Sequence, residues 1–166
     1  MDAYLSALRI LQHRFNSEAE LRRKLRAKRF ENDEIDATIA RLHAEKWLDD
    51  ERFAGAFVRT RANKRVGKLR IRRELHAVGV SRSAAEQAIA ENVDPAREQE
   101  ALVALCARRM RILVRRHGEE YLATEEAHAK LTSYLVAHGY DFALVRETVR
   151  EQLAVGSGQS AEDPHP

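Results

Sequence analysis

The 166-residue chain has few residues that break helices or crosslink chains. Of its three prolines only Pro95 interrupts the body of the sequence, and there are 7 glycines. Because turn residues are scarce while Ala, Leu, Arg and Glu are common, we expect helix throughout and disfavour a β-sandwich or an α/β sheet. The single cysteine, Cys106, excludes an intramolecular disulfide.

Long apolar runs are also missing. No window approaches the roughly 18 apolar residues that a membrane span needs. The first residues show no basic segment followed by an apolar run, so no secretory signal is expected. A lone thiol and a charged composition are typical of a cytoplasmic protein. We therefore expect a soluble, cytoplasmic monomer without a membrane partner.

Side chains that carry catalysis or bind metals do not cluster in the sequence. No two of the seven histidines stand three or four residues apart, as helix-borne metal ligands do. A phosphate-binding glycine loop and a Gly-x-Ser-x-Gly turn are both absent. Acidic pairs such as Asp33-Glu34 stand at expected helix starts, where they favour the positive end of the helix dipole. The sequence thus predicts a binding protein, with no enzyme activity, metal or cofactor.

Charge is segregated along the chain, although the formal net charge is only +3. Residues 31–51 carry eight acids against two bases, whereas residues 52–82 carry ten bases against one acid. Residues 105–117 add five arginines, and residues 118–166 are acidic again. A block of like charge repels itself unless an anion or an acidic partner offsets it. The basic block therefore predicts such a partner.

One apolar pattern occurs three times, in residues 21–30, 71–80 and 131–140. Each copy has two apolar residues four apart, which share a helix face. A small residue follows, and then a position where a helix ends in the left-handed conformation. Glycine fills that position in the second and third copies, whereas Arg29 fills it in the first. A left-handed Arg29 costs on the order of 1 kcal/mol relative to glycine.

Each copy is preceded and followed by another amphipathic stretch, so each unit is predicted to form three helices. Ser17, Ser81, Thr124 and the Asp94-Pro95 pair are predicted helix starts. We expect an all-α fold, an elongated array of three tandem three-helix repeats. The expected boundaries are residues 3–48, 49–93 and 94–153, with a disordered tail at 154–166.

The bases on these helices are the candidate site. Guanidinium groups on rigid helices suit carboxylate or phosphate partners. Aromatic residues are not interleaved with them, so stacking on single-stranded bases is poorly supported. The first set expected to bind such a partner is Arg59, Arg61, Lys64, Arg65, Lys68, Arg70, Arg72 and Arg73. A second set follows Pro95 and consists of Arg108, Arg111 and Arg115.

Residues 47–59, Trp-Leu-Asp-Asp-Glu-Arg-Phe-Ala-Gly-Ala-Phe-Val-Arg, resemble a motif of the RecX regulatory protein family. Residues 17–25 resemble the first repeat of that family. Gly67 and the residues that follow it, up to Gly79-Val80, resemble the second. The resemblance extends over roughly residues 3–153, and the third repeat matches mainly through its spacing.

The resemblance implies a modulator of the RecA recombinase. Such proteins bind along the groove of the RecA–DNA filament and inhibit its extension, strand exchange and co-protease activity. Two residues depart from the family pattern: Arg29 replaces a glycine, and Lys68 stands where a proline often follows Gly67. Trp47 and Phe53 are expected to pack at the junction of the first two repeats, and Asp50 is expected to be a helix cap rather than a contact with the partner.

Two other functions remain open. Residues 75–81 resemble the turn of a helix-turn-helix, whose second helix reads bases with its N-terminal residues. Here that helix would begin Arg82-Ser83-Ala84-Ala85, which is poor in base-reading side chains. An anion-activated nuclease would need a metal-binding carboxylate cluster, which the sequence does not show. A footprint at one operator would favour the first of these functions, and Mg²⁺-dependent turnover of DNA the second.

Overall fold

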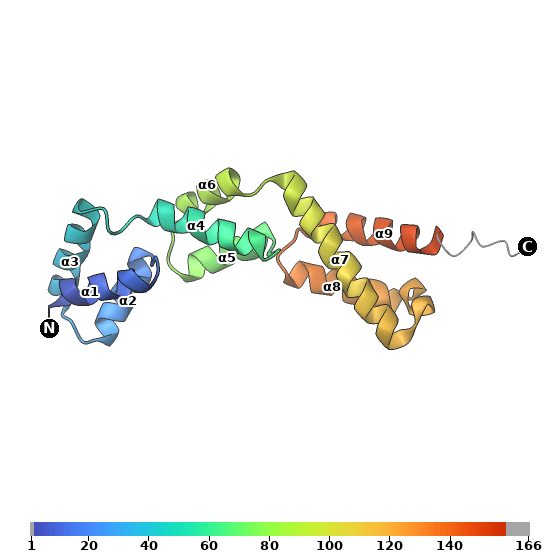
Figure 1. Ribbon diagram of the computed structural model, residues 1–166, viewed down its shortest axis with the longest axis horizontal. Coiled ribbons are helices and arrows are strands. Elements are labelled where there is room, and N and C mark those ends of the chain that lie inside the picture. The colour runs from blue at the N-terminus through green and yellow to red at the C-terminus, as the bar shows by residue number, and fades with distance from the viewer. Residues whose placement is uncertain (1, 159–166) are drawn as a thin grey trace, which may run out of the picture. The chain divides into compact units, whose positions relative to one another are not determined.

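The computed structural model describes residues 2–158, with side chains as far as Val155. Over these residues the chain forms nine α-helices and one short 3-10 helix, η1, and no strand (Figure 1). The predicted all-α class is confirmed. None of the helices in this range is long and apolar enough to cross a bilayer. Their bounds are α1 Ala3–His13, α2 Glu18–Ala27, α3 Asn32–Ala44, α4 Asp50–Asn63, α5 Lys68–Ala77, α6 Arg82–Asn92, α7 Pro95–His117, η1 Glu119–Ala123, α8 Glu125–Ala137 and α9 Phe142–Gly158.

The chain divides into two compact units. Unit 1 comprises Met1–Thr60 and Arg72–Asn92, and unit 2 comprises Arg61–Ile71 and Val93–Pro166. The end of α4 and the start of α5 thus belong to unit 2, with α7, α8 and α9. Each unit is described by itself below.

Burial confirms the repeat pattern. The paired apolar residues at matching positions of α2, α5 and α8 are all fully buried: Leu21, Leu25, Ile71, Leu75, Leu131 and Leu135. The pairs on the helices that follow are buried as well: Ile35, Ile39, Ala85, Ile89, Val145 and Val149. Full burial of a leucine or isoleucine side chain contributes roughly 1.5–3 kcal/mol to folding. The apolar spacing therefore fixes which face of each helix turns inward.

The first core of unit 1 lies between α1, α2 and α3. It consists of Ala7, Leu21, Leu25, Ile35, Ile39, Leu42 and Leu48. The predicted N-cap of α2 forms, since the Ser17 side chain accepts a hydrogen bond from the Glu20 N–H at 3.1 Å. The predicted caps Ser81, Asp94 and Thr124 also accept hydrogen bonds from backbone N–H groups of α6, α7 and α8.

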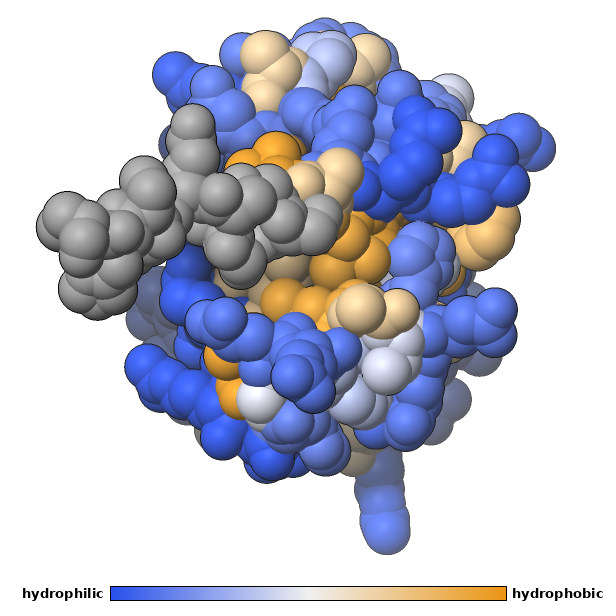
Figure 2. Space-filling model, turned by 90° about the vertical axis from the view of Figure 1, so that its right-hand side faces the viewer, coloured by the Kyte–Doolittle hydropathy of each residue, from blue (hydrophilic) through white to orange (hydrophobic). Residues whose placement is uncertain are grey.

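Unit 2 has its own core between α7, α8 and α9. On α7 the predicted stripe is confirmed, because Leu102, Leu105, Cys106 and Leu113 are buried and Met110 packs against them. Burial raises the pKa of the Cys106 thiol to about 11, so this thiol stays protonated at neutral pH. Figure 2 shows apolar side chains reaching the surface among hydrophilic ones.

Among residues 2–158, five helices end in a left-handed turn of the same form, and glycine holds the left-handed position in only two of them. Gly118, after α7, also has a positive φ of 87°, but its ψ of 167° is extended. The five residues are Arg29, Lys46, Arg65, Gly79 and Gly139, with φ of 65°, 59°, 57°, 84° and 94°. The left-handed Arg29 is confirmed. In each turn the next residue donates its N–H to a carbonyl near the end of the helix, as Val80 does to Leu75 at 3.0 Å.

In unit 1 the end of α5 packs against the start of α2. The Ser17 hydroxyl donates to the carbonyl of Val78. A Cβ added at Gly79 would lie 2.2 Å from the Cβ of Ala19. The two backbones are therefore so close that only a glycine fits at the turn and a small residue opposite it.

In unit 2 the end of α8 packs against the start of α5 in the same way. The Gly67 N–H donates to the carbonyl of His138 at 2.9 Å, and the Leu69 N–H to that of Gly139 at 3.0 Å. A Cβ added at Gly67 would lie 2.4 Å from the carbonyl atoms of Gly139. N–H groups left unpaired at the start of one helix thus pair with carbonyls left unpaired at the end of another.

A carboxylate completes each of these two junctions. In unit 1, Asp50 Oδ1 accepts from the Glu18 N–H, the first of α2, at 2.9 Å. In unit 2, Glu98 Oε1 accepts from the Lys68 N–H, the first of α5, at 3.1 Å. Both acids come from the first helix of the next repeat, α4 or α7. They satisfy backbone donors at the positive end of a helix dipole.

Two expectations are corrected. Trp47 does not pack at a junction, because it is 55% exposed and the left-handed Lys46 turns Leu48 into the core instead. Residues 154–158, predicted to belong to a disordered tail, instead continue α9 to Gly158, and residues 159–166 lie outside the described residues. Asp50 is a helix cap, as predicted, but for α2, while Asp49 accepts from the Arg52 N–H at the start of α4.

The unit 2 junction predicts opposite effects for two glycine substitutions. Gly67→Ala should cost on the order of 2 kcal/mol or more, because its Cβ meets the Gly139 backbone. Gly55→Ala is the matched control: it lies inside α4, and its Cβ would meet only the ends of two side chains, Arg59 Nη1 at 3.3 Å and Asn92 Nδ2 at 3.6 Å. Alanine there should gain up to about 1 kcal/mol in helix propensity. Urea unfolding checks both, and equal effects would contradict the close contact.

The left-handed turn of α2 predicts a stabilising substitution. Arg29→Gly should raise the free energy of unfolding by about 1 kcal/mol, because glycine tolerates this conformation without strain. Arg29→Ala removes the same charge but keeps the Cβ, so it should change stability little. Thermal unfolding of the two variants separates backbone strain from charge. A gain of equal size in both would assign the effect to charge repulsion.

Candidate functional site

Five of the predicted site residues lie in one short segment of unit 2, which comprises the end of α4, the turn after it and the start of α5. They are Arg61, Lys64, Arg65, Lys68 and Arg70. Within this segment Lys64, Arg65 and Arg70 are exposed, whereas Arg61 and Lys68 are half-buried. No described residue forms an ion pair with the side chain of Lys64 or Arg65. We call this segment, residues 61–70, the basic turn.

The backbone of the basic turn is held firmly. Arg65 is left-handed, and its carbonyl accepts a hydrogen bond from the Tyr140 hydroxyl at 3.0 Å. Tyr140 is 1% exposed, and burial raises its pKa to about 12, so the hydroxyl keeps its proton. Gly67 is fixed two residues later by its bond to His138. Lys64 and Arg65 therefore project from a rigid support, which lowers the entropic cost of binding.

Several members of the first set are engaged within the chain, among them Lys68, Arg59 and Arg72. Lys68 Nζ pairs with the buried Glu98 carboxylate at 3.2 Å. Arg59 Nη1 donates to Asn92 Oδ1 at 2.8 Å, a contact that ties α4 to α6. These residues have a structural role that competes with a role in binding.

Arg72, the third of them, is paired with Glu86 of α6, with Nη2 donating to Oε2 at 3.0 Å. The same pair occurs one repeat earlier, because Arg22 pairs with Asp36 at the matching positions of α2 and α3. A pair that recurs with the repeat joins the second helix to the third. The adjacent Arg73 is exposed and has no ion-pair partner among residues 2–158.

The second predicted set lies on α7. Arg108, Arg111 and Arg115 are all exposed and fall on the side of the helix away from the buried stripe. None of them forms an ion pair with a described residue. They are a row of charges separate in sequence from the basic turn.

Sequence reasoning missed a third group of bases, at the end of α2. Residues 22–29 contain six bases and no acid. Of these Arg23, Arg26, Lys28 and Arg29 are exposed. A charge count over residues 22–29 alone would have found them. A count over a longer segment does not, because the acidic residues 31–51 follow closely and offset their charge.

Two models of RecX three-helix domains match the chain. The model of the first domain matches residues 3–42, and that of the second domain matches residues 49–89. These ranges contain α1–α3 and α4–α6.

Curated relatives extend this similarity to most of the chain. A regulatory protein RecX of Salmonella paratyphi A is 38% identical over 148 residues, which cover 81% of each chain. One from Escherichia coli is 37% identical over 145 residues, with the same coverage. The chain belongs to the RecX regulatory protein family. Its relatives are named regulatory proteins rather than enzymes.

Solved structures support the fold. A crystal structure of RecX from Lactobacillus salivarius is similar with a TM-score of 0.75, covering 92% of this chain and 95% of that one at 23% identity. A second crystal structure of a regulatory protein RecX has a TM-score of 0.77 over 90% of this chain and 70% of that chain. At this identity the likeness concerns the helical repeat fold alone.

The helix-turn-helix resemblance has a structural explanation in this RecX family member. The turn between α5 and α6 is covered by the start of α2, through the Ser17 bond to Val78 and the contact of Ala19 with Gly79. The glycine that suggested a DNA-reading turn is required by this contact. No group of three or more metal-ligand side chains is found among the described residues, so the structure offers the nuclease alternative no metal site.

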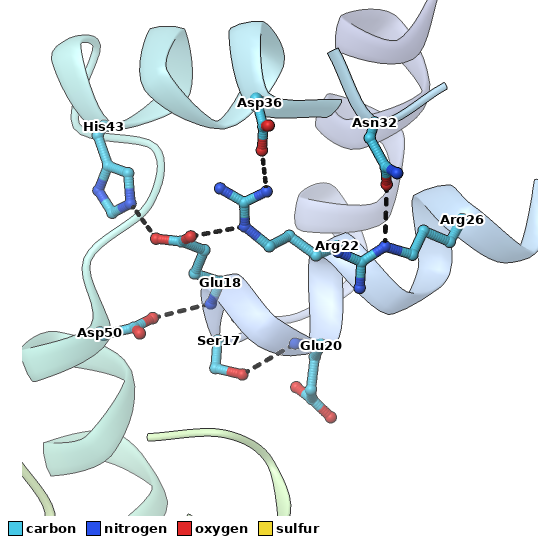
Figure 3. A network of polar contacts seen from close by, with 9 residues as sticks. All are labelled: Ser17, Glu18, Glu20, Arg22, Arg26, Asn32, Asp36, His43 and Asp50. Carbon is cyan, nitrogen blue, oxygen red and sulfur yellow. Dashed lines mark hydrogen bonds and ion pairs between the residues drawn. The ribbon is translucent and has the colours of Figure 1, made fainter. Parts of the chain in front are cut away.

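A network of polar contacts holds the unit 1 junction (Figure 3). Glu18 accepts from Arg22 Nε at 2.7 Å and contacts His43 Nε2 at 2.8 Å, while Asp50 accepts from the Glu18 N–H. Burial opposes ionisation of Glu18, but the bonds from Arg22 and His43 hold its pKa below the usual value. Burial raises the pKa of Asp50 and outweighs the bond from the Glu18 N–H.

Asp50 therefore predicts a pH-dependent difference between two variants. Asp50→Ala removes the acceptor of the Glu18 N–H and should cost about 0.5–2 kcal/mol. Asp50→Asn keeps an acceptor without a charge, so at neutral pH it should be at least as stable as the wild type. Because the pKa of Asp50 is raised in the folded protein, protonation of this carboxyl favours the folded state. The wild type should therefore gain stability relative to Asp50→Asn as the pH falls through the folded-state pKa of Asp50.

Urea unfolding at neutral and acid pH checks this expectation, since the advantage of Asp50→Asn should vanish once the wild-type carboxyl is protonated. If Asp50→Asn instead lost as much as Asp50→Ala at neutral pH, the negative charge rather than the acceptor would hold the junction.

Proposed function

We propose that this protein regulates RecA by binding the RecA–DNA filament and inhibiting its extension, strand exchange and co-protease activity. Membership of the RecX family carries the proposal. The chemistry of the exposed surface supports it, because the family's regulatory role needs a binding surface rather than a catalytic centre.

The basic turn is the part of the surface best suited to contact the filament. Lys64 and Arg65 are exposed, have no ion-pair partner among the described residues, and stand on a backbone fixed by Tyr140 and Gly67. Rigidly placed cations lose little freedom on binding an anion. A filament offers two kinds of anion, DNA phosphate and acidic protein side chains, and an Arg or Lys binds either.

The row on α7 adds a second contact of the same kind. Arg108, Arg111 and Arg115 follow one another along a straight helix, at rises of about 4.5 and 6 Å. Such spacing suits several anions in a line, as along a phosphate backbone. Two separate groups of cations would let one molecule contact more than one site on a polymer and gain avidity.

Reversing charge on the basic turn tests the proposal. Lys64→Glu combined with Arg65→Glu should weaken binding to RecA filaments on single-stranded DNA at least about tenfold at low salt, because attraction becomes repulsion. Inhibition of RecA-dependent ATP hydrolysis should fall in parallel. Co-sedimentation across a salt series measures the first effect, with naked DNA as the comparison.

Arg146→Glu combined with Arg150→Glu is the matched control, because both residues are exposed on α9 of the same unit and the charge change is equal. This control should bind as the wild type does. Unchanged inhibition by a folded Lys64→Glu/Arg65→Glu variant would reject the basic turn as the site. Failure of the wild type to bind filaments at all would reject the function.

A further inference from the structure

The turn that ends α2 has the same form as two turns that are occupied within the chain. Arg29, like Gly79 and Gly139, is left-handed and follows the last helical residues. The turns at Gly79 and Gly139 each receive the N-terminus of another helix, α2 in unit 1 and α5 in unit 2. The turn at Arg29 receives none among the described residues.

The acceptors of this turn are open. In the occupied turn of α8, the carbonyls of His138 and Gly139 accept N–H groups from α5. The matching carbonyls in α2 are those of Lys28 and Arg29, and within residues 2–158 neither accepts a hydrogen bond. Both residues are exposed. The turn thus presents unpaired acceptors at the negative end of a helix dipole.

The side chains around these acceptors are basic and largely unpaired. Arg22 forms ion pairs with Glu18 and Asp36 (Figure 3). Arg26 Nε donates a hydrogen bond to Asn32 Oδ1 at 3.4 Å. The exposed bases with no ion pair to a described residue are Arg23, Arg26, Lys28 and Arg29.

The first acids after the turn do not neutralise these bases. Glu31 and Glu34 are held in a reciprocal capping box at the start of α3. A capping box directs both carboxylates to backbone N–H groups of their own helix. The positive charge at the end of α2 is therefore available to an outside partner.

We propose that this open turn docks the acidic N-terminus of a helix on the protein subunits of the filament. Such a helix offers a partner for both kinds of unpaired group at the turn. Its unpaired N–H groups can donate to the carbonyls of Lys28 and Arg29, and its first-turn carboxylates can pair with the bases. A phosphate matches the bases alone, because its oxygens carry no proton at neutral pH to donate to a carbonyl. The chain already contains the pairing of helix-start donors with turn carbonyls twice. The Ser17 hydroxyl at the start of α2 donates to the end of α5, and N–H groups at the start of α5 donate to the end of α8.

Arg29 sets how closely the partner approaches. At Gly79 an added Cβ would lie 2.2 Å from Ala19, so a helix seated as closely as α2 would collide with the Cβ of Arg29. The docked helix therefore sits somewhat farther from the turn than α2 does at Gly79. Its N–H groups still face the two carbonyls, and side-chain charge contributes a larger share of the contact than in the turns within the chain. Contacts of this kind form quickly and weaken with salt, which suits a reversible regulator.

This inference rests on the proposed function, and the experiment separates the two. Lys28→Glu combined with Arg29→Glu should raise the Kd for RecA filaments about tenfold at low salt and leave any binding to naked single-stranded DNA unchanged. The control is again Arg146→Glu with Arg150→Glu. Circular dichroism of each variant checks folding, and both exposed positions should tolerate the change. Replacing Arg29 with the photo-crosslinker p-benzoylphenylalanine should give a crosslink to the first turn of a RecA helix.

Each outcome decides one question. Equal losses on filaments and on naked DNA would make the turn a phosphate site and overturn the inference, as would a crosslink to DNA. Unchanged filament binding would overturn it while the proposed function stands. A wild type that does not co-sediment with filaments would reject both.

Discussion

The close backbone contact of Gly67 with the turn at Gly139 is the constraint on which unit 2 depends. Helix ends leave N–H and carbonyl groups unpaired, and burying them unpaired would cost more than the packing gains. Here the start of α5 and the end of α8 satisfy one another. The same contact fixes the preceding residues. The exposed Lys64 and Arg65 therefore owe their position to Gly67, which follows them by three and two residues.

Unit 1 meets the same requirement with different residues. A hydroxyl, that of Ser17, replaces the backbone N–H of Gly67 as donor, and Ala19 faces the glycine of the turn. In both units a carboxylate from the next repeat, Asp50 or Glu98, completes the pairing at the first N–H of the helix. Since the contact can be built from several residue types, it recurs where sequence similarity between the repeats is weak. This capping explains the half-buried Asp50 and the buried Glu98 carboxylate.

The helices and their buried faces could be predicted from sequence because both follow from local spacing. Leu21 and Leu25 lie on one face of α2 whatever packs against them. The partners of charged residues could not be predicted, since they depend on which helices meet. Arg72 and Arg73 are adjacent and alike, yet only the first faces Glu86 of α6. One left-handed residue, Lys46, likewise decides that Leu48 and not Trp47 is buried.

The left-handed bases raise a question of cost. Arg29, Lys46 and Arg65 each occupy a conformation that glycine would hold with about 1 kcal/mol less strain. A base at a helix C-terminus recovers roughly 0.3–1 kcal/mol from the dipole. Lys28 and Lys64 already supply that charge one residue earlier, so the dipole alone does not explain a second base. A left-handed residue projects its side chain beyond the end of the helix. Strain retained at an exposed base is consistent with the binding roles proposed above for Arg29 and Arg65.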